Sequence, residues 1–298
     1  MRHLAFLQPL LGIGTRAIRK ADLHRRLAWL ALANRFGRRP ITQPGSPVVS
    51  LTTYGSRSRT VHLAIESIAR GQMRPSRLLL WLDDALLMDR LPAGIKRLQK
   101  RGLEVKGCLN YGPHKKYYPY LESMNDFADL LVTADDDILY PRNWLRKLAE
   151  AYREYPDYLN CHRARVMVLE QDDFAKYDDW QLTHTTEPSL LHFLTGGAGA
   201  IFPPTIQLSL KRASTGFVSR CPRADDIWLN VHSLRAGYKV RQIAKESFRL
   251  VEIPGTQSLA LSHSNVVCKE NDRQIRTTYT ASDVRALRDE WKDLRACP

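Results

Sequence analysis

The feature that most constrains this chain of 298 residues is a short apolar run that ends in three consecutive carboxylates. Residues 129–133 read as a buried strand bounded by turn-forming residues, and Asp135, Asp136 and Asp137 follow it directly. Ligands of α/β sheets bind at the carboxyl ends of strands, where these acids fall. Because adjacent carboxylates repel one another, we expect a divalent cation, Mg²⁺ or Mn²⁺, that carries a phosphorylated ligand. The alternative is a solvated acidic turn that caps the helix predicted at 143–155.

Strands and helices alternate along most of the chain. Apolar runs predict further strands at 48–52, 77–82, 103–106, 164–169 and 239–243. Helical periodicity predicts further helices at 61–69, 91–100, 221–236 and 285–291. This alternation predicts an α/β fold with a mostly parallel, doubly wound sheet flanked by helices.

Two stretches lack such a pattern. The segment 110–121 contains Gly112, Pro113 and Pro119, and we expect it to form no regular structure. Residues 172–188 hold many acids without a clear period, so we expect a loop over the site.

The composition narrows the classes of partner and compartment. The chain has 45 Lys+Arg against 31 Asp+Glu, a net charge of +14, which favours phosphorylated donors, anionic lipids or nucleic acid. No aromatic and basic RNA-binding signature appears, so we disfavour nucleic acid. The five cysteines are odd in number and lack a C-x-x-C pair, which favours reduced thiols in a cytoplasmic protein. No uncharged apolar run approaches the roughly eighteen residues that a membrane-spanning helix needs.

Residues 1–40 form a basic amphipathic N-terminal segment. The segment holds nine Lys and Arg and one acid, Asp22. Arginines alternate with the apolar residues Leu23, Leu27, Trp29, Leu30 and Phe36. This composition is typical of a helix lying in an anionic membrane interface, but a basic helix packed on the domain explains it equally well. The breaker-rich linker 41–47 then ends the segment.

Basic residues occur in two predicted loops. The polar loop 53–60 follows the first strand and carries Arg57, which suits the base and phosphates of a nucleotide. Lys115 and Lys116 precede the acidic strand, where they would contact a diphosphate or be solvated.

A glycine-rich stretch and an acidic pair complete the candidate site. Gly196, Gly197 and Gly199 would let the backbone approach a sugar closely, although a tight structural turn explains them too. Asp225 and Asp226 fall in the first turn of a predicted helix, where the helix dipole alone would also favour them.

Together, these four motifs resemble those of the nucleotide-diphospho-sugar glycosyltransferases of the GT-A fold, in particular bacterial family 2-like members. The resemblance covers about residues 48–274 and depends on the order and spacing of the motifs. It implies that Thr53 and Tyr54 border the nucleotide base, that Asp135 contacts the ribose or the metal, and that an acid at Asp225 or Asp226 is the general base.

The full set of expected site residues follows from the motifs and this resemblance. The donor-binding set is Thr53, Tyr54, Arg57, Lys115, Lys116, Asp135 and Asp136. Gly196 and Gly197 would border the sugar or the acceptor. The resemblance implies that Asp135, Asp137 and His263 hold the Mn²⁺ or Mg²⁺, which would neutralise charge on the departing nucleoside diphosphate.

The sequence therefore predicts a GT-A glycosyltransferase domain at 48–275, between the N-terminal segment 1–40 and a C-terminal helix or tail at 276–298. The expected activity is metal-dependent, inverting transfer of a sugar from a nucleotide-sugar donor to a glycan or lipid-linked acceptor in cell-envelope polysaccharide assembly. We expect a cytoplasmic protein, with peripheral attachment to the inner face of the plasma membrane as a secondary hypothesis.

Two other classes of function stay open at this point. A nucleotidyltransferase would share the sheet, but it needs a glycine-rich, basic loop after the first strand, and 53–60 has one glycine. A non-catalytic basic module that binds membranes or RNA would explain the charge, but it would leave the Asp triplet without a role.

Overall fold

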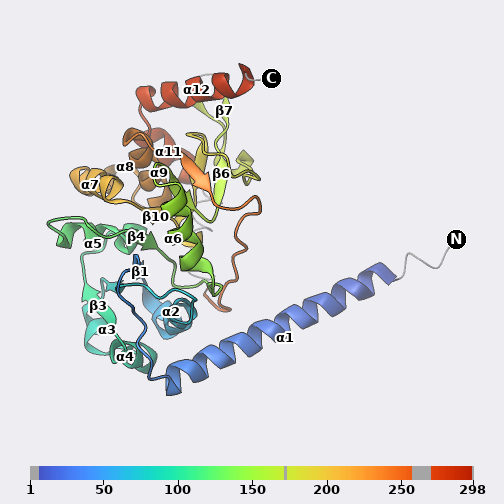
Figure 1. The fold of residues 1–298 in the computed structure, drawn as a ribbon, viewed down its shortest axis with the longest axis vertical. Helices are drawn as coiled ribbons and strands as arrows, with labels where there is room; N and C mark the ends of the chain where they lie inside the picture. Colours follow the sequence, from blue (N-terminus) through green and yellow to red (C-terminus); the bar gives the residue numbers. More distant parts are fainter. Residues whose placement is uncertain (1–6, 171–172, 257–269, 297–298) are drawn as a thin grey trace.

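A computed structural model describes residues 7–170, 173–256 and 270–296, with a five-stranded sheet at its centre (Figure 1). The strand order is β10-β4-β1-β2-β3, formed by β1 (Val48–Thr52), β2 (Leu78–Leu82), β3 (Leu103–Gly107), β4 (Leu131–Thr133) and β10 (Ile201–Phe202). The first four strands run parallel, and β10 is antiparallel to β4. The predicted α/β class with a mostly parallel sheet is confirmed.

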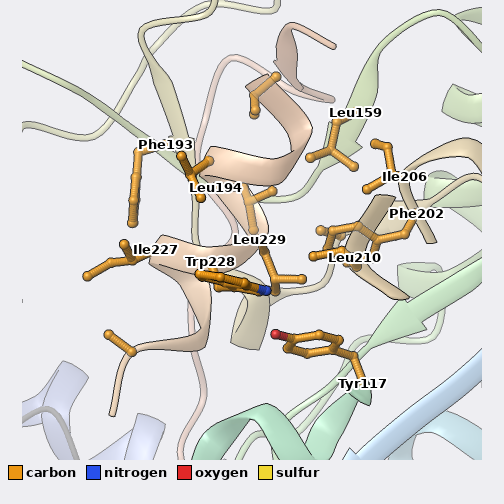
Figure 2. Packing of buried hydrophobic residues seen from close by; sticks show 14 of the residues in the cluster. Tyr117, Leu159, Phe193, Leu194, Phe202, Ile206, Leu210, Ile227, Trp228 and Leu229 are labelled. Carbon is orange, nitrogen blue, oxygen red and sulfur yellow. The ribbon is translucent and has the colours of Figure 1, made fainter. Parts of the chain in front are cut away.

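The sheet is buried on both faces because successive side chains of each strand enter different hydrophobic clusters. Leu78 and Leu80 of β2 pack in a cluster with α2 (Val61–Ala69), α4 (Ala93–Gln99) and α6 (Trp144–Glu154). Leu79 and Trp81 point the other way, into a cluster that includes residues of α5 (Tyr118–Ser123), α7 (Pro204–Arg212) and α9 (Asp225–Arg235). Figure 2 shows part of this second cluster, in which Trp228 and Leu229 of α9 lie close to Tyr117.

Short strand pairs lie outside the central sheet. β5 (Leu159–Cys161) pairs in parallel with β11 (Val240–Gln242). Two antiparallel pairs are β6 (Ala164–Val166) with β9 (His192–Leu194), and β7 (Leu169–Glu170) with β8 (Asp173–Phe174). The remaining elements are α3 (Ala85–Asp89), α8 (Phe217–Arg220), α11 (Glu270–Thr278), α12 (Ala281–Ala296) and the 3₁₀ helices η1 (Gly55–Arg59), η2 (Gly112–Lys116), η3 (Tyr177–Asp179), η4 (Gly196–Ala198) and η5 (Ser214–Gly216).

The expectation that 110–121 forms no regular structure is wrong. Residues Gly112–Lys116 form η2, and α5 begins at Tyr118. Pro113 and Pro119 stand in the first turns of these helices, where a missing backbone N–H removes no intrahelical hydrogen bond. The prolines therefore mark helix starts, and the side chains of Lys115 and Lys116 in η2 are buried.

The two ends of the chain pack on the central domain to different extents. α1 (Leu7–Phe36) contacts the domain through its C-terminal part, where Leu30, Ala33 and Asn34 are buried, while its N-terminal part projects away (Figure 1). At the other end the proposed boundary at 275 falls inside α11, and Leu287 of α12 belongs to the same buried cluster as Leu79. Within the described ranges, no helix combines the length and apolar character that crossing a bilayer requires.

Candidate functional site

A cavity of about 920 Å³ opens at the carboxyl ends of β1 and β4. Most of the residues predicted from sequence line it, namely Tyr54, Arg57, Lys115, Lys116, Asp135, Asp136, Asp137, Gly197, Asp225 and Asp226. Thr53 and Gly196 do not line the cavity themselves, but each donates a hydrogen bond to an acid that does, Thr53 to Asp136 and Gly196 to Asp226. His263 lies outside the described residues. The fold therefore brings together motifs that are far apart in the sequence.

The middle acid of the triplet is held by the loop after β1. Asp136 Oδ2 accepts a hydrogen bond from Thr53 Oγ1 at 2.6 Å, and its Oδ1 accepts one from Arg57 Nη1 at 2.9 Å. Arg57 also donates from Nε to the backbone oxygen of Thr256, and its ring neighbour is Tyr54, 5.5 Å from guanidinium carbon to ring centroid. Asp136 is 4% exposed, and burial raises its pKa even though Arg57 opposes the shift. Asp136 thus fixes the first-strand loop against the acidic turn.

The third acid of the triplet shares its arginine partner with the second. Asp137 Oδ2 lies 3.1 Å from Arg57 Nη2, the same guanidinium that pairs with Asp136. Burial and the neighbouring carboxylate of Asp135 together raise the pKa of Asp137 to about 7, against the opposing effect of Arg57. One arginine therefore pairs with two neighbouring carboxylates, and the mutual repulsion of the acids favours the protonated form of Asp137.

Lys116 joins the two acidic motifs. Its Nζ lies 2.7 Å from Asp135 Oδ1 and 3.0 Å from Asp225 Oδ2, so one buried ammonium bridges the triplet and the acidic pair. Burial alone would lower the pKa of Lys116, but the surrounding carboxylates outweigh it and hold the pKa well above its usual value. Lys116 is therefore charged, and it holds the carboxyl end of β4 close to the start of α9. Its neighbour Lys115 instead pairs with Asp83 at 2.6 Å.

The glycine-rich stretch lies between the same two motifs. The backbone N–H of Gly196 donates to Asp226 Oδ1 at 2.8 Å, and a Cβ at this position would lie 2.9 Å from that oxygen. A Cβ at Gly197 would overlap Asp135 Oδ2. The backbone oxygen of Gly197 accepts a hydrogen bond from Tyr140 at 2.8 Å. Glycine is needed at both positions because at each one a carboxylate oxygen occupies the space that a Cβ would take.

The acidic pair of α9 has two members in different environments. Burial raises the pKa of Asp225, although the charge of Lys116 opposes the shift. Burial and the adjacent Asp225 raise the pKa of Asp226 to about 7. Asp226 also faces the cavity with partial exposure. A carboxylate with such a pKa is a stronger proton acceptor than an ordinary aspartate at neutral pH.

Several cavity residues were not predicted from the sequence. Arg165, Tyr177 and Glu252 line the cavity from separate segments, with the Arg165 guanidinium carbon 5.1 Å from the Tyr177 ring centroid. No local pattern identifies them, because tertiary packing alone brings them to the site. Asp83 was identifiable in principle, since it follows β2 just as the triplet follows β4. Tyr177 belongs to 172–188, which contains β8 and η3 and so is not wholly irregular.

The donor atoms of the acidic cluster suit a hard divalent cation. Among the described residues no group of three or more His, Cys, Asp or Glu side chains is arranged as a metal site. Mg²⁺ is commonly held by one or two carboxylates, with substrate phosphates and water completing its shell. Asp135 and Asp137 provide two carboxylates in a cluster where acids outnumber bases. The residues present therefore fit a cation that arrives with a phosphorylated ligand.

Comparisons with known proteins give only distant structural similarity. No protein-family model and no curated protein matches the sequence. The similar solved structures include CMP:2-keto-3-deoxy-manno-octonic acid synthetase complexed with CTP, with 12% identity, a TM-score of 0.43, and coverage of 75% of this chain and 98% of that chain. Residues 1–349 of TarS from S. aureus are similar with 14% identity, a TM-score of 0.42, and coverage of 65% of this chain and 57% of that chain. The 4-diphosphocytidyl-2C-methyl-D-erythritol synthase from Anaerococcus prevotii DSM 20548 is similar with 13% identity, a TM-score of 0.46, and coverage of 76% of this chain and 97% of that chain. Similarity at this level carries no functional argument.

Proposed function

We propose that this chain is a glycosyltransferase of the GT-A type, which moves a sugar from a nucleotide-diphospho-sugar to a hydroxyl of a glycan or lipid-linked acceptor. One observation carries the proposal. The acidic triplet after β4 and the acidic pair of α9 face one cavity and share Lys116 between them. A carboxylate cluster for the donor diphosphate and a separate base for the acceptor are the two parts that inverting glycosyl transfer requires.

On the donor side, the residues bind and orient the nucleotide diphosphate. Asp135 and Asp137 would hold Mn²⁺ or Mg²⁺, which supplies charge neutralisation to the leaving diphosphate. Arg57 and Asp136 keep the first-strand loop, with Tyr54 beside it, in place to receive the base and ribose. Lys115 lines the same cavity, where its ammonium is paired with Asp83.

On the acceptor side, we assign the base to Asp226. Its carboxylate accepts the proton of the acceptor hydroxyl as that oxygen bonds to the anomeric carbon and the bond from this carbon to the diphosphate breaks. The electron pair of the broken bond leaves with the nucleoside diphosphate, so the anomeric configuration inverts. Gly196 orients Asp226 through its N–H, whereas Asp225 is paired with Lys116.

The direct test is incubation of the protein with sugar nucleotides and Mn²⁺, with measurement of the nucleoside diphosphate released. We expect release from one class of donor, faster with acceptor than by hydrolysis alone, and a product of inverted configuration by NMR. Release of no nucleoside diphosphate under any of these conditions would contradict the proposal.

A nucleotidyltransferase is the second candidate, favoured by the cations that line the cavity. Lys115 and Lys116 are suited to a triphosphate as well as to a diphosphate. Against it, Arg57, the arginine of the first-strand loop that lines the cavity, is already paired with two carboxylates. Pyrophosphate release from a nucleoside triphosphate and a sugar substrate would select this reading over glycosyl transfer.

A further inference from the structure

The described side chains of helix α1, residues 18–36, form two apolar faces, and among the described residues the body of the protein buries one of them. Leu23, Leu27 and Leu30 pack in a cluster with Leu139 and Ile253 of the central domain. At about 100° per residue these leucines lie on the opposite side of the helix from a second apolar stripe.

The second stripe points into solvent. Ile18, Trp29, Leu32 and Phe36 are 70%, 53%, 57% and 68% exposed, and helical spacing places them within about 60° of one another. The paired Asp22 and Arg25 fall on the same side between Ile18 and Trp29, so the continuous part of the stripe is Trp29, Leu32 and Phe36. They are four of the nine large hydrophobic residues that are exposed in the described part of the chain, and the other five are scattered over separate elements. Scattered exposed hydrophobics need no explanation, whereas a stripe along one helix marks an interaction surface.

The connection between α1 and the domain is rigid at the end that carries most of the stripe. Asn34 is 1% exposed and donates to Glu66 Oε1 at 3.3 Å and to the backbone oxygen of Gly94 at 3.1 Å. The guanidinium carbon of Arg70 lies 4.5 Å from the ring centroid of Trp29. A surface bound by the stripe would therefore fix the orientation of the whole domain, not only that of a tethered segment.

The positive charge around the stripe favours an anionic surface as its binding partner. The exposed cations of this region are Arg19, Lys20, Arg25, Arg35, Arg38 and Arg39, whereas Asp22 is its one acid and is paired with Arg25 at 2.8 Å. Two copies of this helix would repel each other, while an anionic surface would attract it. Arginines beside Trp, Leu and Phe on one helix are the composition that lies in an anionic lipid interface.

We propose that the stripe of Ile18, Trp29, Leu32 and Phe36 inserts into an anionic membrane surface and docks the domain there, with α1 lying in the plane of the interface. The covered face of the same helix packs on Leu139 and Ile253, and the N–H of Ile253 donates to the backbone oxygen of Asp137 in the cavity at 2.7 Å. Docking would thus hold the candidate site close to the lipid. A lipid-linked acceptor is the substrate class that suits this arrangement, a consequence that rests on the proposed glycosyl transfer.

The test is co-sedimentation of the full chain, without donor, with vesicles of phosphatidylcholine and with vesicles that also contain about 30% phosphatidylglycerol. We expect binding to the anionic vesicles and weakening at high salt, because exposed charges are screened. The double variant Leu32→Glu/Phe36→Glu should lower the vesicle-bound fraction constant by at least about tenfold.

The matched control is Leu86→Glu/Leu109→Glu, which changes two leucines that lie outside α1 and are at least as exposed, and which should bind like the unmodified chain. Both double variants should keep the unfolding midpoint, since all four side chains are exposed. Equal vesicle binding by the two double variants, or no binding to anionic vesicles, would overturn the proposal. A dimer in lipid-free solution that Leu32→Glu/Phe36→Glu dissociates would also overturn it and assign the stripe to a second copy. Because donor turnover does not enter the assay, a failure of the proposed chemistry leaves this result unaffected.

Discussion

Two ion-pair clusters in this protein contain similar groups but differ in charge balance. Below α1, the single carboxylate of Glu66 is fully buried and is paired with Arg101 and with Arg70. At the cavity, the carboxylates Asp135, Asp136, Asp137 and Asp225 share the cations Arg57 and Lys116, with Asp226 beside them. The first cluster is closed by packing, whereas the second lines a cavity of about 920 Å³.

The difference separates a structural role from a functional one. A buried carboxylate with enough partners serves packing and specificity of the fold. Carboxylates that outnumber their partners raise one another's pKa and oppose folding, so stability does not explain their presence. Cavity acids with too little positive charge are what a site for a cation and a phosphorylated ligand would contain. Substitutions at the two clusters test this difference in role.

The largest expected effect is on stability, at the closed cluster. Glu66→Gln leaves Arg101 buried without its counter-ion, and breaking a buried pair in this way typically costs about 3–5 kcal/mol. Urea unfolding would measure the loss. A loss below about 1 kcal/mol would show that the closed cluster is not structural in this sense.

The next effect is on activity, at the open cluster. Asp226→Asn should lower the rate of transfer by about 10²–10⁴-fold, the range for a lost general base, because an amide cannot take the acceptor's proton. The amide oxygen can still accept the hydrogen bond from Gly196, so the fold should persist. Asp225→Asn should cost less, since its partner Lys116 keeps Asp135. The exposed Asp178→Asn serves as the control, and equal rates for the variants at 225 and 226 would reject the assignment.

The pH dependence follows from the pKa of Asp226, which is raised from 3.8 to about 7 in the folded protein. The base acts when deprotonated, so kcat/KM should rise with pH through about 7 and level off above it. The folded state binds this proton more tightly than the unfolded state, so the contribution of Asp226 to stability should fall as pH rises from about 4 to about 7.

Asp226→Asn should therefore stabilise the protein above pH 7, on the order of 1–2 kcal/mol after screening at this partly exposed site. Thermal unfolding of both proteins at pH 5 and pH 8 would measure this gain. Asp137, which has a similar pKa, should retain part of the pH dependence in the variant. A variant less stable than the parent at pH 8 would contradict the charge imbalance at the open cluster.

The smallest expected effect comes from a partly exposed pair of the same chemical type. Arg77 and Glu104 form a bidentate pair whose side chains are 33% and 32% exposed, and Glu104→Gln should cost less than about 1 kcal/mol. Urea unfolding beside Glu66→Gln would give the comparison directly. Similar losses for the two variants would remove burial as the cause of the larger effect.

The parts of this protein that could be predicted are those with local causes. β1 and α2 occupy the predicted residues because the spacing of apolar side chains within each segment indicates which of them are buried. The Asp triplet follows β4 and the acidic pair opens α9, as expected from strand ends and helix starts.

What could not be predicted depends on contacts between distant segments. The bridge from Lys116 to Asp135 and Asp225 has no signal in any single stretch, and the prolines of 110–121 suggest a loop until the helix starts are known. Likewise, the amphipathic pattern of α1 did not reveal that Leu30 is buried while Leu32 is exposed. Packing against α2 decides between the two faces.

The measurement that tests the central claim most directly is a thermal-shift comparison of the parent protein and Asp137→Asn with UDP-, GDP-, CMP- and dTDP-sugars, with and without Mn²⁺. A ligand that binds only the folded state stabilises it by about 2.7 kcal/mol at a hundred times its Kd. We predict a Mn²⁺-dependent rise in midpoint with one class of donor for the parent, and its loss in Asp137→Asn without a lower midpoint for the variant alone. No shift with any donor, or the same shift in Asp137→Asn, would contradict the claim that the open acidic cluster binds the nucleotide diphosphate.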